Sequence, residues 1–150
     1  LVGSEMCIRD SICPFEALLA KPRSGKTLLT LPEGARVLPP VPVPGTALDR
    51  VAAATTSGHL LVFPAADLPA LNRGKGNKII GIPSARVQSR EEFVVAVKVL
   101  TERDALAIYA GKRHLKLKFA ELEHYRGERG RRGNKLPRGF QKVDGMSVES

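Results

Sequence analysis

The sequence predicts an all-β fold built from repeated, propeller-like units, and three observations carry this prediction. Short apolar runs alternate with Gly-containing turns along most of the chain, as they do in β-hairpins. A composite motif recurs three times at a spacing of about fifty residues, which lies in the range of propeller blades. Hydrophobic residues make up 43% of the 150 residues, enough for a core, and the helical signals are single turns.

The repeated motif has the same parts in the same order each time. An aromatic residue with an acid and Leu after it comes first, and a basic Gly-bearing segment follows. The three basic segments are residues 23–26 (RSGK), 73–78 (RGKGNK) and 126–135 (RGERGRRGNK). An apolar stretch then closes on Pro32, Pro83 or Pro137, so the prolines stand 51 and 54 residues apart. We expect units at about 12–44, 45–90 and 91–150.

Hairpins are the clearest local prediction. Residues 114–119 (HLKLKF) place Leu and Phe on one face and Lys on the other, which is typical of a half-buried strand. Residues 59–63 (HLLVF) are the counterpart one unit earlier. Each run follows a Gly-containing turn and another apolar run, residues 51–56 or 105–109, so each predicts a hairpin.

The remaining elements are expected around these hairpins. Residues 93–100 (FVVAVKVL) are rich in Val and predict a more buried strand, and residues 140–148 predict a further strand. Residues 64–71 and 120–125 predict single helical turns. Residues 37–44 (VLPPVPVP) contain four prolines, which predicts an edge strand or a connector between units.

The start of the chain is interpreted separately. Residues 1–11 (LVGSEMCIRDS) look like the translation of a sequencing adaptor, and we exclude them from fold reasoning as one would a cloning scar. On this interpretation residues 12–150 are the fragment of interest, and a longer protein precedes them. The two cysteines make neither a disulfide framework nor a metal-ligand set, which favours a reducing cytoplasm.

Positive charge is concentrated in the last third of the chain. The formal net charge is +9, and residues 112–142 hold eleven Lys or Arg against three Glu, a balance of 11 − 3 = +8. Residues 126–140 alone hold six Lys or Arg and four Gly. Such a run favours a polyanionic partner, with nucleic acid as the first candidate and an anionic membrane surface as the second. A solvated, flexible loop is the alternative.

Catalytic motifs are weak or absent. Residues 20–27 (AKPRSGKT) resemble a phosphate-binding loop, but Ala20 replaces its first Gly and a strand, not a helix, is expected after it. His59, His114 and His124 lack metal-ligand spacing, and the first two occupy the same place in successive units, which favours a structural role. No nucleophile with a matching base can be argued. We therefore expect no active site in this chain.

The three basic segments would fall at one place in each unit and form a positive stripe along the rim of the assembly. A duplex held through its phosphates is the partner that such a stripe fits. There is no recognition helix and little aromatic interleaving, so neither base readout nor stacking on single strands is favoured. If about five phosphates are engaged, the log–log salt slope should be near −4.5, at ~0.9 for each phosphate.

Three segments closely resemble a known family. Residues 24–41, 68–85 and 111–144 are similar to the C-terminal domain of the bacterial DNA topoisomerase IV A-subunit, and the likeness runs from about residue 15 to residue 149. Its most specific piece is GERGRRGNKLPRGFQ, residues 127–141, which resembles the proteobacterial form. The sister family, the DNA gyrase A-subunit, carries a box QRRGGKG whose nearest analogue here is RGKGNK. This difference favours topoisomerase IV.

The resemblance implies a fold and a role. The fold would be a β-pinwheel of four-stranded antiparallel blades, of which about two and a half to three are present. The role would be noncatalytic binding and bending of double-stranded DNA for a type II topoisomerase that relaxes supercoils and separates linked chromosomes. The catalytic tyrosine would lie outside this chain. The residues that the resemblance assigns to DNA binding are Arg73, Lys75, Lys78, Lys112, Arg113, Lys116, Arg126, Arg129, Arg131, Arg132, Lys135 and Arg138.

The resemblance also implies partners for the whole enzyme. The polypeptide would dimerise and pair with the ATPase B-subunit in a heterotetramer, using ATP bound by that partner and Mg²⁺. It would be cytoplasmic and associated with the nucleoid, with a peripheral place at the inner membrane. Three alternatives stay open: a gyrase A-subunit domain, a protein-docking propeller with a charged rim, and an RNA-binding β module.

Overall fold

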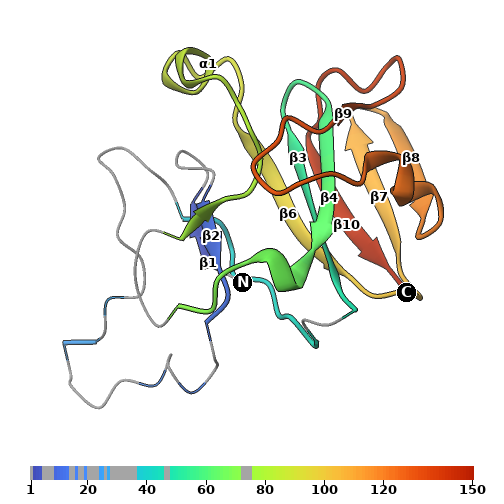
Figure 1. Cartoon of the computed structure of the whole chain (residues 1–150). Coiled ribbons are helices and arrows are strands. Elements are labelled where there is room, and N and C mark those ends of the chain that lie inside the picture. Colours follow the sequence, from blue (N-terminus) through green and yellow to red (C-terminus); the bar gives the residue numbers. More distant parts are fainter. Residues whose placement is uncertain are drawn as a thin grey trace.

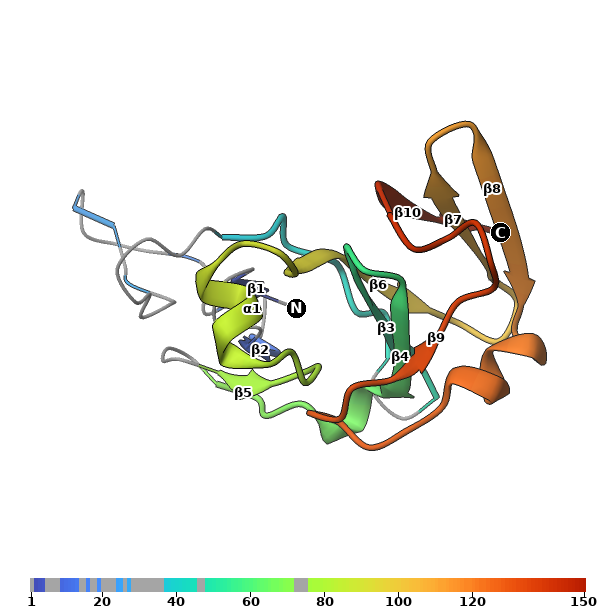
Figure 2. The same ribbon diagram turned by 90° about the horizontal axis from the view of Figure 1, so that it is seen from above.

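The computed structural model describes residues 2–4, 9–13, 16, 19, 24–25, 27, 37–45, 48–71 and 76–150. Within these residues the strands form three antiparallel sheets that follow one another from left to right in Figures 1 and 2. One short helix, α1 (Ser84–Gln88), and two 3-10 turns lie in the connections. The chain is therefore all-β, as the sequence predicts.

The middle sheet has the strand order β6-β3-β4-β9. The β3–β4 hairpin forms its centre, with β3 (Arg50–Thr55) pairing Val51 with Phe63 of β4 (His59–Pro64). The outer strands are β6 (Val94–Leu100) and β9 (Asn134–Lys135).

The third sheet has the order β10-β7-β8. Its hairpin joins β7 (Ala105–Ala110) to β8 (Arg113–Lys118), and β10 (Gly145–Glu149) lies on the other side of β7. In β8 the side chains of Leu115 and Leu117 are partly or fully buried while the Lys side chains are exposed, which confirms the predicted alternation.

The first sheet is smaller and has the order β1-β2-β5. It consists of β1 (Val2–Ser4), β2 (Arg9–Ser11) and β5 (Asn77–Lys78). Residues 1–11, which the sequence analysis set aside, thus supply two of its strands. Their adaptor origin stays a prediction.

Sheets are completed by residues from further along the chain. Both β5 and β9 are the dipeptide Asn-Lys, and each follows the hairpin of one unit to pair with the sheet before it. Lys135 pairs with His59, 76 positions earlier (135 − 59), and Lys78 pairs with Arg9. Successive sheets are therefore linked by short exchanged strands as well as by packing.

Two apolar cores lie on the two faces of the middle sheet. Because side chains alternate along a strand, neighbouring residues of β3 and β4 enter different cores. Ala52, Leu60 and Val62 pack with Leu106 and Ile108 of the third sheet. The opposite face buries Val51, Ala53, Leu61 and Phe63 with Ile79 and Ile80, the residues after β5. Burial on both faces explains why β4 has an unbroken apolar sequence.

The helical turns at residues 64–71 and 120–125 are confirmed as η2 (Ala65–Asp67) and η3 (Glu121–Tyr125). Residues 38–44 form no strand and act as a connector, with Val37 in an isolated bridge. Helix α1 was not predicted. It begins after Pro83, whose fixed φ of −55° suits a helix start, but it buries no residue and so lacks an apolar stripe. The unit boundaries remain predictions.

A glycine gives a test of the strand exchange. Gly133 precedes β9 with φ +79°, and a Cβ there would lie 2.5 Å from the carbonyl oxygen of Leu60. Gly133→Ala should cost ~3 kcal/mol or more in the free energy of unfolding, because the left-handed conformation and the backbone overlap both oppose it. Urea unfolding checks this.

Gly111→Ala is the matched control for that variant. Gly111 has φ +59°, but a Cβ at this position would meet nothing within 4 Å, so only the conformational cost of ~1–2 kcal/mol applies. Equal losses in the two variants would mean that β9 does not lie against β4 as described.

Candidate nucleic-acid interface

The basic run is a loop that crosses from the third sheet to the first and then returns to the middle one. We call residues 126–135 the crossing loop. It begins after η3, reaches the segment that follows β5, and ends in β9 (Figure 2). The amide of Gly81 donates to the carbonyl of Arg131 at 2.7 Å, and the amide of Gly130 donates to the carbonyl of Ile79 at 2.9 Å. The loop is therefore paired backbone to backbone with the preceding unit.

Two arginines strengthen this attachment. The Arg129 guanidinium donates to the carbonyl of Lys78 at 2.9 Å, and that of Arg132 donates to the carbonyl of Gly81 at 3.3 Å. Gly81 permits the approach because a Cβ at this position would lie 2.8 Å from the carbonyl oxygen of Gly130. The sequence spacing of 51 residues between each donor and its acceptor matches the repeat period.

Arg132 also binds a buried carboxylate. Its Nη2 lies 2.6 Å from Oε2 of Glu92, whose side chain is completely buried. Arg86 of α1 reaches the same oxygen at 3.2 Å from the solvent side. Burial raises the pKa of Glu92, but hydrogen bonds from Arg132, from the Ser57 and Thr55 hydroxyls and from Arg86 outweigh this and bring it to about 2.

The neighbouring histidine is neutral near pH 7. His59 is buried at the start of β4, with Nδ1 3.6 Å from Oε1 of Glu92. Burial lowers its pKa below 6.5, and the charges of Arg132, Lys135 and Arg86 lower it further, against the opposing effect of Glu92. The structural role predicted for His59 fits this position.

The other arginines of the crossing loop face solvent. Arg126 pairs with Glu123 at 3.5 Å, and Arg131 pairs with Glu128 at 3.1 Å with about three quarters of both side chains exposed. Exposed pairs of this kind contribute little, ~0–1 kcal/mol each. A phosphate can therefore replace either carboxylate at small cost. A hollow of about 330 Å³ lies beneath these residues and is lined partly by Arg126, Arg131 and Arg132.

A second set of cations lies where the hairpin turns meet. The backbone amide of Leu136 donates to the carbonyl of Gly58, and the amide of Gly111 donates to Asp144 at 2.5 Å, so both hairpin turns adjoin residues 136–144. No carboxylate in the described part of the chain pairs with any cation of this set, which we call the hairpin-edge group. The hairpin-edge group consists of Lys112, Arg113, Lys135, Arg138 and Lys142.

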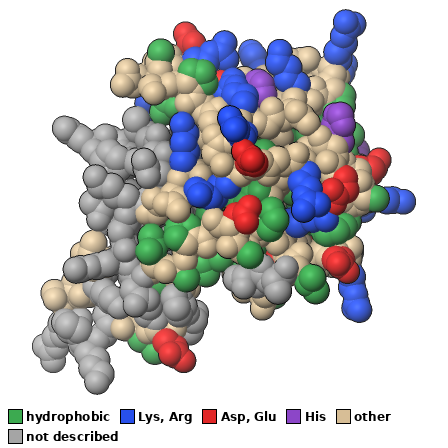
Figure 3. Space-filling view, in the orientation of Figure 1, with side chains coloured by type: hydrophobic (Ala, Val, Ile, Leu, Met, Phe, Trp, Pro, Cys, Tyr) green, Lys and Arg blue, Asp and Glu red, His purple; other side chains and the backbone are tan. Residues whose placement is uncertain are grey.

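Figure 3 shows Lys and Arg side chains gathered along the upper edge of the molecule, above the hairpin turns. Acidic side chains lie mostly over the middle and the right of this view. All five members of the hairpin-edge group are exposed. The crossing loop and this edge meet at Lys135, which ends the loop and pairs with β4. Together they make a positive surface that is open to a polyanion.

The predicted DNA-binding residues differ in their surroundings. Arg113, Lys112, Lys135 and Arg138 are exposed and unpaired among the described residues, while Arg126, Arg129, Arg131 and Arg132 hold protein groups. Lys78 is exposed on β5. Arg73 and Lys75 lie outside the described residues. Lys142, which lies in the hairpin-edge group, was not among the predicted residues. The sequence analysis also missed Glu92, whose position before an apolar strand gave no sign of a buried acid.

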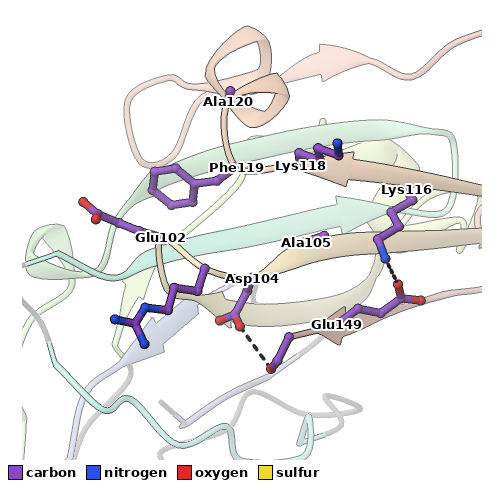
Figure 4. A pocket seen from close by; sticks show the side chains of 10 residues that line it. Glu102, Asp104, Ala105, Lys116, Lys118, Phe119, Ala120 and Glu149 are labelled. Atoms are coloured by element: carbon purple, nitrogen blue, oxygen red, sulfur yellow. Dashed lines mark hydrogen bonds and ion pairs between the residues drawn. The ribbon is translucent and has the colours of Figure 1, made fainter.

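Lys116 lies apart from the other predicted residues, as Figure 4 shows. Its Nζ pairs with Glu149 at 2.5 Å beside a hollow of about 390 Å³ at the far end of the third sheet. Arg103, Lys118, Glu102 and Asp104 also line this hollow. The mixture of signs suits no single charged ligand, so we do not assign the hollow to nucleic acid.

The described residues hold neither a metal-binding cluster nor a membrane-spanning helix. Within the described residues no group of three or more His, Cys, Asp or Glu side chains could hold a metal ion. In the same residues no helix is long and apolar enough to cross a bilayer.

Known proteins similar to this chain agree with one another. The chain is 57% identical over 134 residues to the A-subunit of DNA topoisomerase 4 of Pseudomonas aeruginosa and 47% identical over 139 residues to that of Escherichia coli K12. These matches cover 89% and 93% of the chain but 18% of each relative. The solved E. coli ParC C-terminal domain superposes with a TM-score of 0.86 at 42% identity, over 99% of this chain and 60% of that one.

The chain belongs to the DNA topoisomerase IV A-subunit family. Its fold is the β-pinwheel of that family's C-terminal domain. A DNA gyrase A C-terminal domain superposes with a TM-score of 0.70 at 15% identity, over 100% of this chain and 48% of that one, which shows a shared fold only. The gyrase alternative is therefore not the better one. No protein-family model matches the chain.

The buried acid gives this topoisomerase IV family member a predicted pH dependence. A folded-state pKa of about 2, against an ordinary 4.5, means that the unfolded chain takes up the proton first as pH falls. Glu92 should therefore contribute on the order of 3 kcal/mol above pH 4.5, and this is lost between pH 4.5 and 2. The lowered pKa of His59 acts in the same direction, beginning below pH 6.5.

Urea unfolding between pH 7 and pH 2.5 measures this dependence. Glu92→Gln should be less stable at pH 7 and should lose less stability on acidification than the parent. Glu91→Gln, at an exposed neighbouring site, is the control and should follow the parent. Parallel curves for Glu92→Gln and the parent would show that the carboxylate is not held ionised by its partners.

Proposed function

We propose that this domain binds duplex DNA without catalysing a reaction, through phosphate contacts along the hairpin-edge group and the crossing loop. The hairpin-edge group carries the proposal. Five exposed cations whose charges no described carboxylate neutralises lie on one edge, and the exposed arginines of the crossing loop continue them. Water solvates these unpaired cations, so their exposure costs little free energy. A polyanion with regularly spaced phosphates can take the place of that water.

The shape of the surface favours a duplex over a single strand. The cations belong to two successive sheets and to the loop between them, so they follow the rim of a stack and not a narrow groove. Of the aromatic rings near the hairpin-edge cations, Phe140 is buried, and Tyr109 and His114 form one exposed cross-strand pair beside Arg113, which is a short platform for stacking bases. A duplex that follows this rim would bend, at ~1–6 kcal/mol per 20–30 base pairs, which several arginine–phosphate contacts can offset.

For the whole protein we propose the activity of its relatives' family, a type II topoisomerase that relaxes and decatenates DNA. The chain spans about a fifth of the curated relatives it matches, 18% of each. ATP on a partner B-subunit, Mg²⁺, dimerisation and the catalytic tyrosine are accordingly proposed for parts outside this chain. A cytoplasmic place on the nucleoid, with peripheral contact at the inner membrane, is proposed on the same ground.

A salt titration tests the proposed function. If the five hairpin-edge cations each engage one phosphate, log K plotted against log salt concentration should fall with a slope near −4.5, at ~0.9 per phosphate. Fluorescence anisotropy with a labelled duplex of 30 base pairs measures it, with single-stranded RNA and an acidic polypeptide as competitors. Stronger binding of either competitor, or an affinity that ignores salt, would contradict the proposal.

A matched pair of double variants locates the surface. Lys112→Gln with Arg113→Gln removes two charges at the turn of the β7–β8 hairpin, and Arg103→Gln with Lys118→Gln removes two at its other end. Only the first pair should reduce the slope, by about 1.8. Net charge is the same in both, so equal reductions would place the contact elsewhere.

A further inference from the structure

The buried carboxylate of Glu92 lies between the segments that the interface depends on. It follows α1, comes just before β6, and has its side chain fully inaccessible to solvent. Its Oε2 accepts from Arg132 of the crossing loop at 2.6 Å and from Arg86 at 3.2 Å. The crossing loop is thus tied to the segment between α1 and β6 by an ion pair between residues 40 positions apart.

Stability alone does not explain a buried acid here. Removing a carboxylate from water is costly, and apolar side chains of similar volume often serve a core as well or better. The Ser57 and Thr55 hydroxyls lower the pKa of Glu92 without making a hydrogen bond of full geometry to Oε1, and His59 Nδ1 lies 3.6 Å away, so within the described residues this oxygen is incompletely satisfied. A buried ion pair of this kind fixes one arrangement of the chain, since an unpaired charge in any other arrangement is strongly disfavoured.

The arrangement that it fixes is that of the arginines which face solvent. Arg132 turns inward, with about a third of its side chain exposed, whereas Arg131 beside it turns outward. The Arg132 guanidinium also donates to the carbonyl of Gly81. Its fork is therefore occupied by protein oxygens, and a phosphate would have to compete with a buried carboxylate for it.

We propose that Glu92 is a positioning residue for DNA binding, which acts through Arg132 to hold the crossing loop in the shape that presents Arg126 and Arg131 to phosphates. This rests on the proposed function. It assigns Arg132, which the sequence places among the phosphate-binding residues, to the support of the loop. Without the ion pair between Glu92 and Arg132, the glycine-rich loop would have to become ordered when DNA binds. The entropy lost in that step would weaken the binding.

The proposal and simple electrostatics predict opposite effects for one substitution. Glu92→Gln raises the formal net charge by one, from +9 to +10, so charge alone predicts equal or tighter binding to DNA. The positioning role predicts about tenfold weaker binding at 100 mM salt, because the loop is no longer pre-organised. Glu91→Gln adds the same charge at an exposed site and should bind as tightly as the parent or slightly more tightly.

The experiment is a double-mutant cycle measured by anisotropy on a 30-base-pair duplex, using the whole 150-residue chain. Glu92→Gln, Arg132→Gln and the double variant should all weaken binding to about the same extent, since either change breaks the one tie. Arg86→Gln should keep the loop in place and lose only what one exposed cation contributes. Additive losses, or undiminished binding by Glu92→Gln, would overturn the proposal.

Hydrogen exchange supplies the readout that separates positioning from general stability. The amides of Gly81 and Gly130 form the backbone hydrogen bonds between the crossing loop and the segment after β5. They should exchange faster in Glu92→Gln and Arg132→Gln, while the amides of β7 stay protected. Unchanged exchange at these two amides would overturn the proposal. If Glu92→Gln does not unfold cooperatively in urea, Arg132→Gln is used alone: weaker binding together with faster exchange at the two amides supports the tie, and unchanged exchange overturns it.

Failure of the proposed function has a different signature. In that case the parent itself shows no salt-dependent affinity for the duplex. The exchange measurement still decides whether Glu92 holds the crossing loop, because it requires no DNA.

Discussion

The arrangement of this domain depends on strand exchange between successive units. A two-residue strand contributes few ladder hydrogen bonds, so β9 would be marginal alone. It is held because the crossing loop before it bonds to residues 78–81 and Leu136 after it bonds to the turn of β4. The strand exchange carries the basic crossing loop past all three sheets. The path of this loop therefore decides where the positive charge lies on the surface.

The same path divides the basic residues by what they contact. Arg129 and Arg132 of the crossing loop bond to carbonyls and a carboxylate from earlier in the chain, whereas the cations at the hairpin turns face water. A high local charge therefore serves two purposes, attachment between units and attraction of a partner. Arginine suits the first because its fork bonds to two acceptors at once, as Arg132 does with Glu92 and Gly81.

Local patterns in the sequence predicted the hairpins. The alternation in residues 114–119 and the apolar run in residues 59–63 depend only on neighbouring residues, so both can be recognised without knowing the fold. The repeat period predicted that the basic segments recur in equivalent places. The pairing of β5 and β9 was not predictable, because Asn-Lys carries no hydropathy pattern and its partners lie far away in the chain. Glu92 was missed for a related reason: its burial comes from Arg132, 40 positions later.

The pairing of Lys135 with His59 has a consequence for biosynthesis. When the β3–β4 hairpin leaves the ribosome, the residues that cover its outer edge have not yet been made. That edge is then open to partners in neighbouring nascent chains until some seventy further residues emerge, which takes about 4–14 seconds at ~5–20 residues per second. Translation order thus gives each unit a period of exposure that ends only with the arrival of the next.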